Sequence, residues 1–426
     1  MWHTLSREGI QAPLDYAFRR ALEAAHPSEA ATRLPAVLGG TLTVPVAAAL
    51  LARRAGRTAG IVTGILLAVS PFHVRYSQEA RPYALGMLLL CLSLLLLDRF
   101  VERQSPARLA LLYLSSLATA YALYVAALML LVAGAGLLIE DAFAPEPERA
   151  RNSRRFLAWS PVFAGALWTG FLPWWPVFLT AIGNAPMGVA PHWSLARIPR
   201  FLSFFGFGNT DLAPLGLFGA LFAAGCIAGT VIAWKKAGTR FLLVWSVVGF
   251  GILEVLEQRH PIFDSIFHFT PAGLSLAFLY SLSIAALLRR KATCAIGAAV
   301  LALSLVFSAL SLGAYFQTGR PDWRPLAAYL RATPNEDRIV TDTDYTQLCV
   351  GYYVAGPDWF LMLRRHASPR QIDSLHGEPV RLDSLREPGR TAWLVRMAST
   401  AVPGPGAEIA FPTAEGHAFV RRIDPR

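Results

Sequence analysis

Long apolar runs separated by short polar segments occupy residues 34–316 of the chain. A helix that spans a membrane needs about 20 mainly apolar residues. Single runs of suitable character cover residues 34–52, 59–74, 84–97, 157–179, 215–234, 241–256, 270–288 and 294–316. The stretch 109–139 is too long for one span, so we expect two helices joined by a tight turn near residues 119–124. The pattern predicts a polytopic α-helical membrane protein with about ten transmembrane helices.

The two ends of the chain follow other patterns. In residues 1–33, Leu14, Phe18 and Leu22 recur at a spacing of four, which predicts an amphipathic helix lying at the membrane interface. Residues 317–426 alternate the helix-like run WRPLAAYLRAT with the strand-like runs DRIVTD, TAWLVRM and HAFVRRI, which predicts a small α/β domain. No glycine-rich phosphate loop follows a strand in this domain, so a nucleotide-binding domain is not indicated.

The basic residues predict the side of the membrane on which each loop lies. One alternating set of loops carries most of them, namely Arg53/Arg54/Arg57, Arg99/Arg103/Arg108, Arg149/Arg151/Arg154/Arg155, Lys235/Lys236/Arg240 and Arg289/Arg290/Lys291. The positive-inside rule places these loops in the cytoplasm. Residues 1–33, the loop near 75–83, the loop 180–214, the loop around 260–268 and the domain 317–426 are therefore predicted to lie outside.

Composition supports a membrane protein and excludes other classes. Only 16% of the residues are charged and 54% are hydrophobic, whereas a soluble protein has about a quarter charged residues. The net charge of +11 is dispersed over small loop clusters, so the sequence does not indicate a nucleic-acid partner. The four cysteines are too few and too scattered for a disulfide framework or a zinc site.

The run RYSQEARPYAL, residues 75–85, carries the candidate chemistry. Between two apolar runs it places Arg75, Tyr76, Glu79, Arg81 and Tyr83. Charged side chains at the edge of a bilayer are costly unless water, each other or a ligand satisfies them, which makes the cluster a candidate functional site. The alternative is a solvated turn with interfacial tyrosines and a local salt bridge.

The sequence around this cluster resembles a known superfamily. The run from RLPAVLGG to SPFHVRYSQEARPYAL resembles the GT-C superfamily of integral-membrane glycosyltransferases, most closely the bacterial branch with the aminoarabinose transferases, the rhizobial lipopolysaccharide-sugar transferases and the relatives of protein O-mannosyltransferases. Upstream, APLDYAFRRALEAAH resembles the external amphipathic helix of that branch. Downstream, GRPDWRPLAAYLRAT resembles the start of its extracytoplasmic C-terminal domain.

The resemblance implies an inverting glycosyltransferase of the bacterial cytoplasmic membrane that acts in the cell envelope. Such an enzyme moves a sugar from a polyprenyl-phosphate donor to a lipid, glycan or protein acceptor on the outer side. Carried over by motif position, Glu79 is the expected catalytic carboxylate and the ligand of a divalent metal ion, if one is used; no other cofactor is implied. Arg75 and Arg81 are expected to neutralise the donor phosphate. Tyr76 and Tyr83 are expected to pack on the sugar or the first isoprene unit.

Two departures from the branch leave alternatives open. In that branch the principal catalytic acid follows an earlier transmembrane helix, which has no counterpart in this sequence. Asp15 is not the equivalent of that acid, because it occupies a tyrosine position of the external helix. We therefore expect an N-terminally truncated sequence; the alternatives are a catalytically silent paralogue or a transporter of lipid-linked substrates, although no internal duplication supports a transporter.

The second departure replaces an Arg-Tyr pair with His268 and Phe269. His268 is expected to bind substrate, and a metal pair with His260 is a further option. The alternative is that both are ordinary loop histidines.

Overall fold

The computed structural model of the chain describes residues 13–25, 28–183, 201–202, 204–206, 215–259, 266–318, 323–333, 337–341, 350–351, 353–354, 372–374, 391–398, 408–413 and 416–423. The chain forms two compact units, Met1–Leu312 and Gly313–Arg426.

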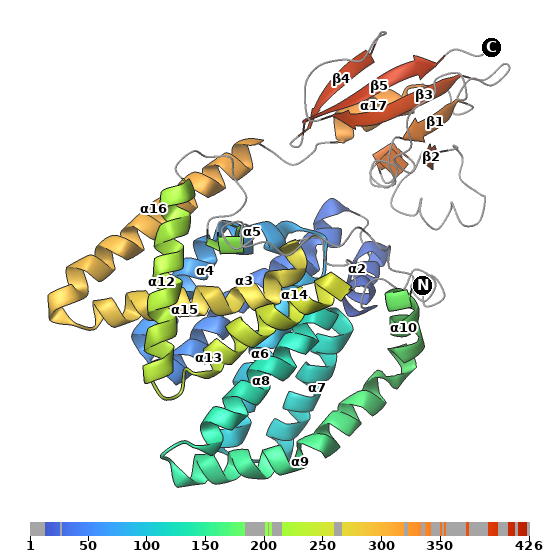
Figure 1. Ribbon diagram of the computed structural model, residues 1–426. Coiled ribbons are helices and arrows are strands. Elements are labelled where there is room, and N and C mark those ends of the chain that lie inside the picture. Colours follow the sequence, from blue (N-terminus) through green and yellow to red (C-terminus); the bar gives the residue numbers. More distant parts are fainter. Residues whose placement is uncertain are drawn as a thin grey trace. The chain divides into compact units, whose positions relative to one another are not determined.

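The first unit is a bundle of helices (Figure 1). Its α-helices are α2 (Pro13–Ala25), α3 (Glu29–Ala55), α4 (Arg57–Val69), α5 (Pro71–Gln78), α6 (Tyr83–Glu102), α7 (Pro106–Ala122), α8 (Tyr124–Ala142), α9 (Pro147–Phe171), α10 (Trp175–Gly183), α12 (Leu215–Lys235), α13 (Phe241–Leu243), α14 (Gly249–Arg259), α15 (Thr270–Leu288) and most of α16 (Cys294–Thr318), whose last turns belong to the second unit. Shorter turns are η1 (Leu172–Trp174), the π-helical η2 (Val244–Val248), η4 (Ile266–Phe269) and η5 (Lys291–Thr293).

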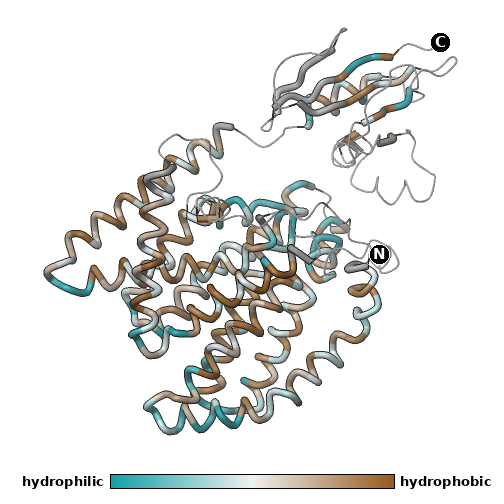
Figure 2. The backbone as a smooth tube through the Cα atoms, viewed as in Figure 1, coloured by the Kyte–Doolittle hydropathy of each residue, from teal (hydrophilic) through white to brown (hydrophobic). Residues whose placement is uncertain are grey.

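Six of the described helices are long and apolar enough to cross a membrane, or seven if the bent pair α4–α5 counts as one span. Shorter apolar helices cover Gly219–Lys235 and Phe241–Leu256. Figure 2 shows hydrophobic residues along most of the helices and hydrophilic residues at their connections. The helical membrane fold agrees with the sequence, while the count of about ten spans stays a prediction.

Local sequence explains two helix boundaries that position the rest of the bundle. The stretch 109–139 breaks at Leu123 (φ −158°, ψ 113°), which confirms the two predicted helices. The predicted span 59–74 instead bends by 58° between α4 and α5. Ser70 precedes Pro71 and is extended there (φ −64°, ψ 120°), because the proline ring disfavours a helical conformation in the residue before it.

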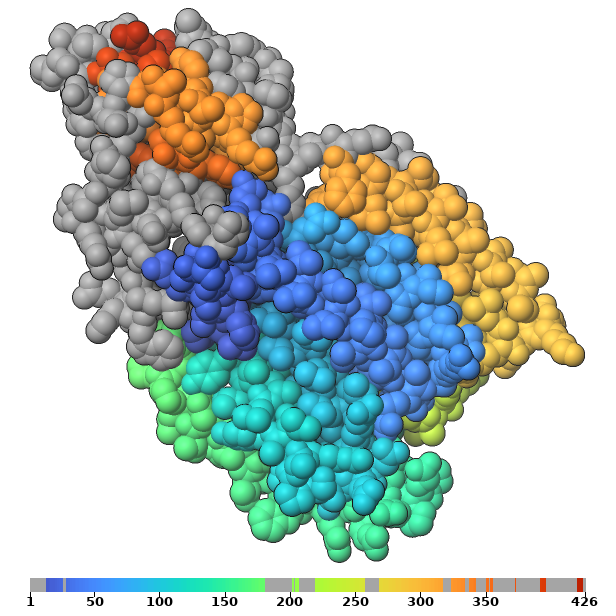
Figure 3. Space-filling view, turned by 180° about the vertical axis from the view of Figure 1, so that it is seen from behind, coloured from blue at the N-terminus to red at the C-terminus, as the bar shows by residue number. Residues whose placement is uncertain are grey.

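Helices α6 and α15 form the centre of the bundle, and α9 and α16 are mostly exposed. Helix α15 packs against α12, α4 and α6, while α3 packs against α4 and α6. Helices α2 and α3, in blue, lie together on the face shown in Figure 3. The exposed apolar side chains of α9 and α16 are the surface expected of helices that face lipid.

A buried group of charged side chains ties several loops together at one end of the bundle. We call Arg54, Asp98, Glu140, Asp141 and Arg149 the Arg54 cluster. Arg54 forms ion pairs with Asp98 (3.0 Å) and Asp141 (2.9 Å), and Arg149 forms ion pairs with the same two carboxylates. Arg54 Nε also donates to the carbonyl oxygen of Gly238 (2.8 Å).

The Arg54 cluster brings together loops from the alternating set that the sequence assigns to the cytoplasm. Its members come from the ends of α3, α6 and α8 and the start of α9. Lys236 Nζ and an Arg289 guanidinium nitrogen add two further loops, since each donates to the carbonyl oxygen of Ala55 at 2.6 Å. The five loops with the most basic residues therefore meet at one end, as the alternation of spans requires.

Removing the central guanidinium should destabilise the bundle strongly. We expect Arg54→Ala to lower the free energy of unfolding by about 3–5 kcal/mol, because Asp98 and Asp141 would each lose a buried guanidinium partner and Arg149 would be left to neutralise both. Thermal unfolding of the detergent-solubilised chain measures the effect. Arg57→Ala is the matched control, since Arg57 is exposed in the next helix; equal unfolding temperatures for both variants would contradict the expectation.

The second unit contains the helix α17 (Arg324–Arg331) and a five-stranded sheet. The strands are β1 (Arg338–Thr341), β2 (Ile372–Ser374), β3 (Ala392–Ala398), β4 (Glu408–Thr413) and β5 (Gly416–Ile423), in the order β2-β1-β3-β5-β4. Strands β2, β1 and β3 are parallel, and β3, β5 and β4 are antiparallel. Leu326 and Leu330 of α17 pack with Ile339, Trp393 and Val420 of the sheet. The helix and the three strand-like runs agree with the predicted α/β character; the placement of this unit outside the membrane stays a prediction.

Candidate functional site

The predicted cluster lies at the junction of α5 and α6. Ser70 caps α5, because its side chain accepts a hydrogen bond from the backbone of His73 (3.4 Å), and Pro71 occupies the first helical position. Helix α5 ends at Gln78 and is followed by its C-cap residue Glu79, whose carbonyl oxygen accepts from the backbone of Arg81 (2.7 Å). We call residues 79–82 the site loop; the bend between α4 and α5 sets its direction.

Two adjacent glycines of α3 let this region pack directly on the helix. A Cβ on Gly39 would lie 2.8 Å from the backbone nitrogen of Leu85, and a Cβ on Gly40 would overlap the side chain of Ser77. The buried His73 donates from Nε2 to the carbonyl oxygen of Gly40 (3.0 Å). Helix α5 and the start of α6 are thereby held against α3.

The charged side chains of the cluster form two groups around the site loop. In the first, Arg75 Nε donates to Glu79 Oε1 (3.2 Å), and the Glu79 side chain is only 21% exposed. In the second, Arg81 hydrogen-bonds the side chain of Tyr83 and lies close enough to His268 to influence its charge. Burial, and then the charge of Arg81, lower the pKa of His268 to about 4. His268 is therefore neutral at pH 7 in this structure, and the positive charge comes from the two arginines.

The two tyrosines of the cluster are part of a buried aromatic group. Tyr76 is 2% exposed and Tyr83 is 6% exposed, and their rings meet edge to face with centroids 5.3 Å apart. Phe72 packs against Tyr76 (5.4 Å), and His268 packs against Tyr83 (6.1 Å). The rings of Tyr76, Tyr83 and His268 connect α5 and the start of α6 to η4. The contact of the two tyrosines with a sugar or isoprene unit stays a prediction.

Two buried residues of α2, to which the sequence assigns no functional role, adjoin the site loop. Arg19 donates from a guanidinium nitrogen to the carbonyl oxygen of Ala80, within the site loop, and pairs with Asp15. Asp15 is fully buried, and burial raises the pKa of its carboxyl group to about 6 against the opposing effect of Arg19. In the predicted apolar stripe, Phe18 is 49% exposed and Leu14 and Leu22 are half-buried, which is compatible with the interfacial helix that the sequence predicts. The spacing of four between Asp15 and Arg19 is the sequence signal for this pair.

The described donors around the site loop do not make a metal site by themselves. Among the residues that the structure describes, no group of three or more His, Cys, Asp or Glu side chains lies together. Glu79 faces the Arg75 guanidinium, Asp15 faces Arg19, and His260 lies outside the described residues. We therefore derive no step through a metal ion, and a metal at Glu79 stays a prediction.

Because the pKa of Asp15 is raised, we expect the contact between α2 and the site loop to stabilise the fold more in acid than at neutral pH. Between about pH 4 and pH 6 the folded chain holds a proton on Asp15 that the unfolded chain has lost, so this group contributes stability in acid and loses it as the pH rises towards 6. The rise of the Asp15 pKa from its ordinary value to about 6 corresponds to roughly 3 kcal/mol in the free energy of unfolding.

The test compares thermal unfolding between pH 5 and pH 7. Relative to the parent chain, Asp15→Asn/Arg19→Gln should gain less stability on acidification. The matched control is Glu29→Gln/Arg33→Gln, which removes the more exposed pair at the same spacing (3.7 Å). Parallel pH profiles for the parent chain and the α2 variant would show that Asp15 does not titrate in this range.

Comparisons with known proteins agree with the resemblance in sequence. Residues 14–175 match the family model described as dolichyl-phosphate-mannose-protein mannosyltransferase. No curated protein matches the chain. The family match includes α2, the site loop and the Arg54 cluster, and it ends in α10.

Solved structures show the fold. The chain is similar to ArnT from Cupriavidus metallidurans in the apo state, with a TM-score of 0.55, 12% identity, and coverage of 96% of this chain and 87% of ArnT. The same protein bound to undecaprenyl phosphate gives a TM-score of 0.54, 12% identity, and coverage of 97% and 88%. An oligosaccharyltransferase from Archaeoglobus fulgidus gives a TM-score of 0.51 and 12% identity, with 85% of this chain and 53% of that chain covered. The expected resemblance is confirmed: the chain has the fold of the GT-C membrane glycosyltransferases, and its residues 14–175 carry the sequence pattern of the mannosyltransferase family.

Proposed function

We propose that the protein transfers a sugar from a polyprenyl-phosphate donor to a lipid, glycan or protein acceptor on the outer side of the bacterial cytoplasmic membrane. The observation that carries the proposal is the site loop, which brings Arg75, Glu79 and Arg81 to the end of a bent helix pair. The ArnT structure bound to undecaprenyl phosphate supports the class of donor, because it has the same fold over most of this chain.

The charges of the site suit the departing phosphate. In a single displacement, an acceptor hydroxyl forms a bond to the anomeric carbon while the bond from that carbon to the phosphate oxygen breaks. The electron pair stays on the polyprenyl phosphate, the hydroxyl proton passes to solvent through a base that the proposal leaves unassigned, and the anomeric configuration inverts. Guanidinium groups suit the developing phosphate charge because they can donate two hydrogen bonds at once. Arg81 and Arg75 take this role in our proposal.

Two roles for Glu79 can be separated by experiment. Its Oε1 already accepts from Arg75 (3.2 Å), so we assign it the role of holding that guanidinium towards the phosphate. A positioning role predicts weaker binding of undecaprenyl phosphate by Glu79→Gln, whereas a role as base predicts unchanged binding and a lower turnover number. General-base catalysis contributes about a hundred- to ten-thousandfold in rate.

The test uses the full-length chain in detergent or lipid nanodiscs. Binding of undecaprenyl phosphate is measured directly, and transfer is measured as its release from a panel of undecaprenyl-phosphate pentoses and hexoses. Loss of both activities in Glu79→Gln and Arg81→Ala would support the proposal. Full activity of both variants beside an active parent chain would show that the cluster is not the site. Binding without transfer by the parent chain with every donor would favour a catalytically silent protein.

A further inference from the structure

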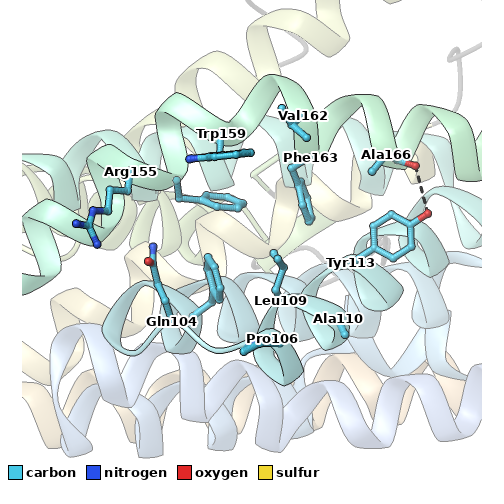
Figure 4. Close-up of a pocket in the computed structure, with 12 residues that line it drawn as sticks. Gln104, Pro106, Leu109, Ala110, Tyr113, Arg155, Trp159, Val162, Phe163 and Ala166 are labelled. Atoms are coloured by element: carbon cyan, nitrogen blue, oxygen red, sulfur yellow. Dashed lines mark hydrogen bonds between the residues drawn. The ribbon is translucent and has the colours of Figure 1, made fainter.

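A groove between α7 and α9 is not used by the proposed transfer reaction. It has a volume of about 760 Å³ and is lined by one face of each helix (Figure 4). On α9 the lining residues Arg155, Trp159 and Phe163 recur at a spacing of four. On α7, Leu109 and Tyr113 repeat that spacing. The walls are therefore two parallel stripes of mainly apolar side chains.

The two ends of the groove differ in charge. At one end the Tyr113 hydroxyl donates to the carbonyl oxygen of Ala166 (3.2 Å), which joins the two helices. At the other end Arg155 and Gln104 face the opening (Figure 4). Gln104 donates to the carbonyl oxygen of Asn152 (3.2 Å). The groove thus has an apolar body and a cationic mouth.

Arg155 at the mouth and Arg151, about one helical turn before it on α9, have no protein partner among the residues that the structure describes. Arg155 and Arg151 are both exposed and are four residues apart on α9. Neither has a hydrogen bond or an ion pair there, in contrast to Arg154, which donates to the carbonyl oxygen of Ala142 (2.9 Å). Two such cations beside an apolar groove complement an anionic group with an apolar tail.

The length of the groove matches half of a bilayer. From Arg155 to Ala166 the α9 wall rises by about 16 Å at about 1.5 Å per residue, and half of the hydrocarbon core is about 15 Å thick. Trp159 is 65% exposed and Val162 is 61% exposed, so the walls are open to lipid. An acyl chain from one leaflet fits this length.

The mouth of the groove lies at the end of the bundle that holds the Arg54 cluster. Helix α6 begins at the site loop and ends beside that cluster, and its 20 residues correspond to about 30 Å. A polyprenyl phosphate whose phosphate is held by Arg81 is therefore at the other end of the helices. The occupant of the groove must belong to the leaflet on the side of the basic loops.

We propose that the groove binds an anionic phospholipid of that leaflet, with one acyl chain between α7 and α9 and its phosphate at Arg155 and Arg151. Each arginine near a membrane surface contributes about 1 kcal/mol towards an anionic lipid, which is about fivefold in affinity per residue. The aromatic walls add contact with the acyl chain. The site is separate from the proposed transfer reaction and does not depend on it.

The test purifies the full-length chain in a mild detergent and measures the retained lipids by mass spectrometry. Arg151→Gln/Arg155→Gln removes the charge, and Ala110→Phe fills the groove at an exposed lining position. Matched controls are Arg290→Gln, exposed at another basic loop, and Ala299→Phe, exposed on α16. We expect both groove variants to lose anionic phospholipid by at least about fivefold and both controls to retain it.

Add-back experiments identify the occupant. The delipidated parent chain should gain thermal stability with phosphatidylglycerol, whereas phosphatidylcholine and undecaprenyl phosphate should stabilise it less. The groove variants should lose this preference and remain monodisperse in gel filtration. Equal retention of anionic lipid by variants and controls would overturn the proposal. An equal response to phosphatidylcholine, or a stronger response to undecaprenyl phosphate that Ala110→Phe removes, would overturn it as well.

Discussion

An Arg81→Ala variant should transfer sugar about a hundred- to a thousandfold more slowly than the parent chain, because a positioned donor would be lost where negative charge develops on the leaving phosphate. Arg81 is half-buried, close to Tyr83 and His268. We do not expect His268 to replace this charge, because burial, the larger cause of its lowered pKa, remains in the variant. The measurement is the initial rate of undecaprenyl-phosphate release.

Two variants control the Arg81 experiment. Arg81→Lys keeps the charge but loses the planar fork of donors, so it should recover only part of the rate. Arg33→Ala removes an arginine from the first turns of α3, where it pairs with Glu29 (3.7 Å), and should transfer sugar at the parent rate. If Arg33→Ala lost as much activity as Arg81→Ala, the effect would reflect net charge and not the site loop.

A Gly40→Ala variant should lose about a hundredfold in transfer rate, because a displacement of about 1 Å in a positioned group can have that effect. The added Cβ would overlap the Ser77 side chain and push α5 away from α3. It would also strain the hydrogen bond from His73 to the carbonyl oxygen of Gly40. Overpacking of this kind costs about 1–3 kcal/mol, so the unfolding temperature should fall as well.

A second substitution tests the cause of the Gly40 effect. In Gly40→Ala/Ser77→Gly the overlapping side chain is absent, and the nearest remaining Ser77 atom is the Cα at 3.2 Å. The double variant should therefore recover most of the lost rate. Ser77→Gly alone loses the hydrogen bond from Ser77 Oγ to the His73 carbonyl oxygen (2.6 Å) and should be mildly destabilised. Gly165→Ala has open space around the added Cβ and should behave like the parent chain; failure of the double variant to recover would place the cause elsewhere.

Local patterns in the sequence predict much of the fold. The break at Leu123, the helix α17 and the strands β1, β3 and β5 follow from hydrophobic periodicity and turn residues. The bend at Ser70–Pro71 is also a local effect, yet the run 59–74 reads as one span because hydropathy does not record the direction of a helix axis. The cluster itself is visible because its charges interrupt two apolar runs.

Contacts between distant segments account for what the sequence does not predict. Arg19 meets Ala80 across 61 residues, and the spacing of Asp15 and Arg19 indicates that they can pair but not that the pair is buried against the site loop. The neutral state of His268 depends on its burial and on Arg81, two features of the folded chain. The burial of Tyr76 likewise arises from aromatic side chains of other segments, such as Phe204. Whether Arg75, Glu79 and Arg81 bind a donor phosphate stays a prediction.

The partners of Arg54 also impose an order on biosynthesis. Asp98 lies 44 residues after Arg54, Asp141 lies 87 residues after it, and the carbonyl oxygen of Gly238 lies 184 residues after it. At about 5–20 residues per second, the last of these emerges from the ribosome roughly 10–40 seconds after Arg54. During that interval α3 can insert and associate with α6 and α8, but the loop after α12 cannot close over the buried ion pairs. The early helices should therefore remain sensitive to proteolysis at the ends that hold the Arg54 cluster until α12 has been synthesised.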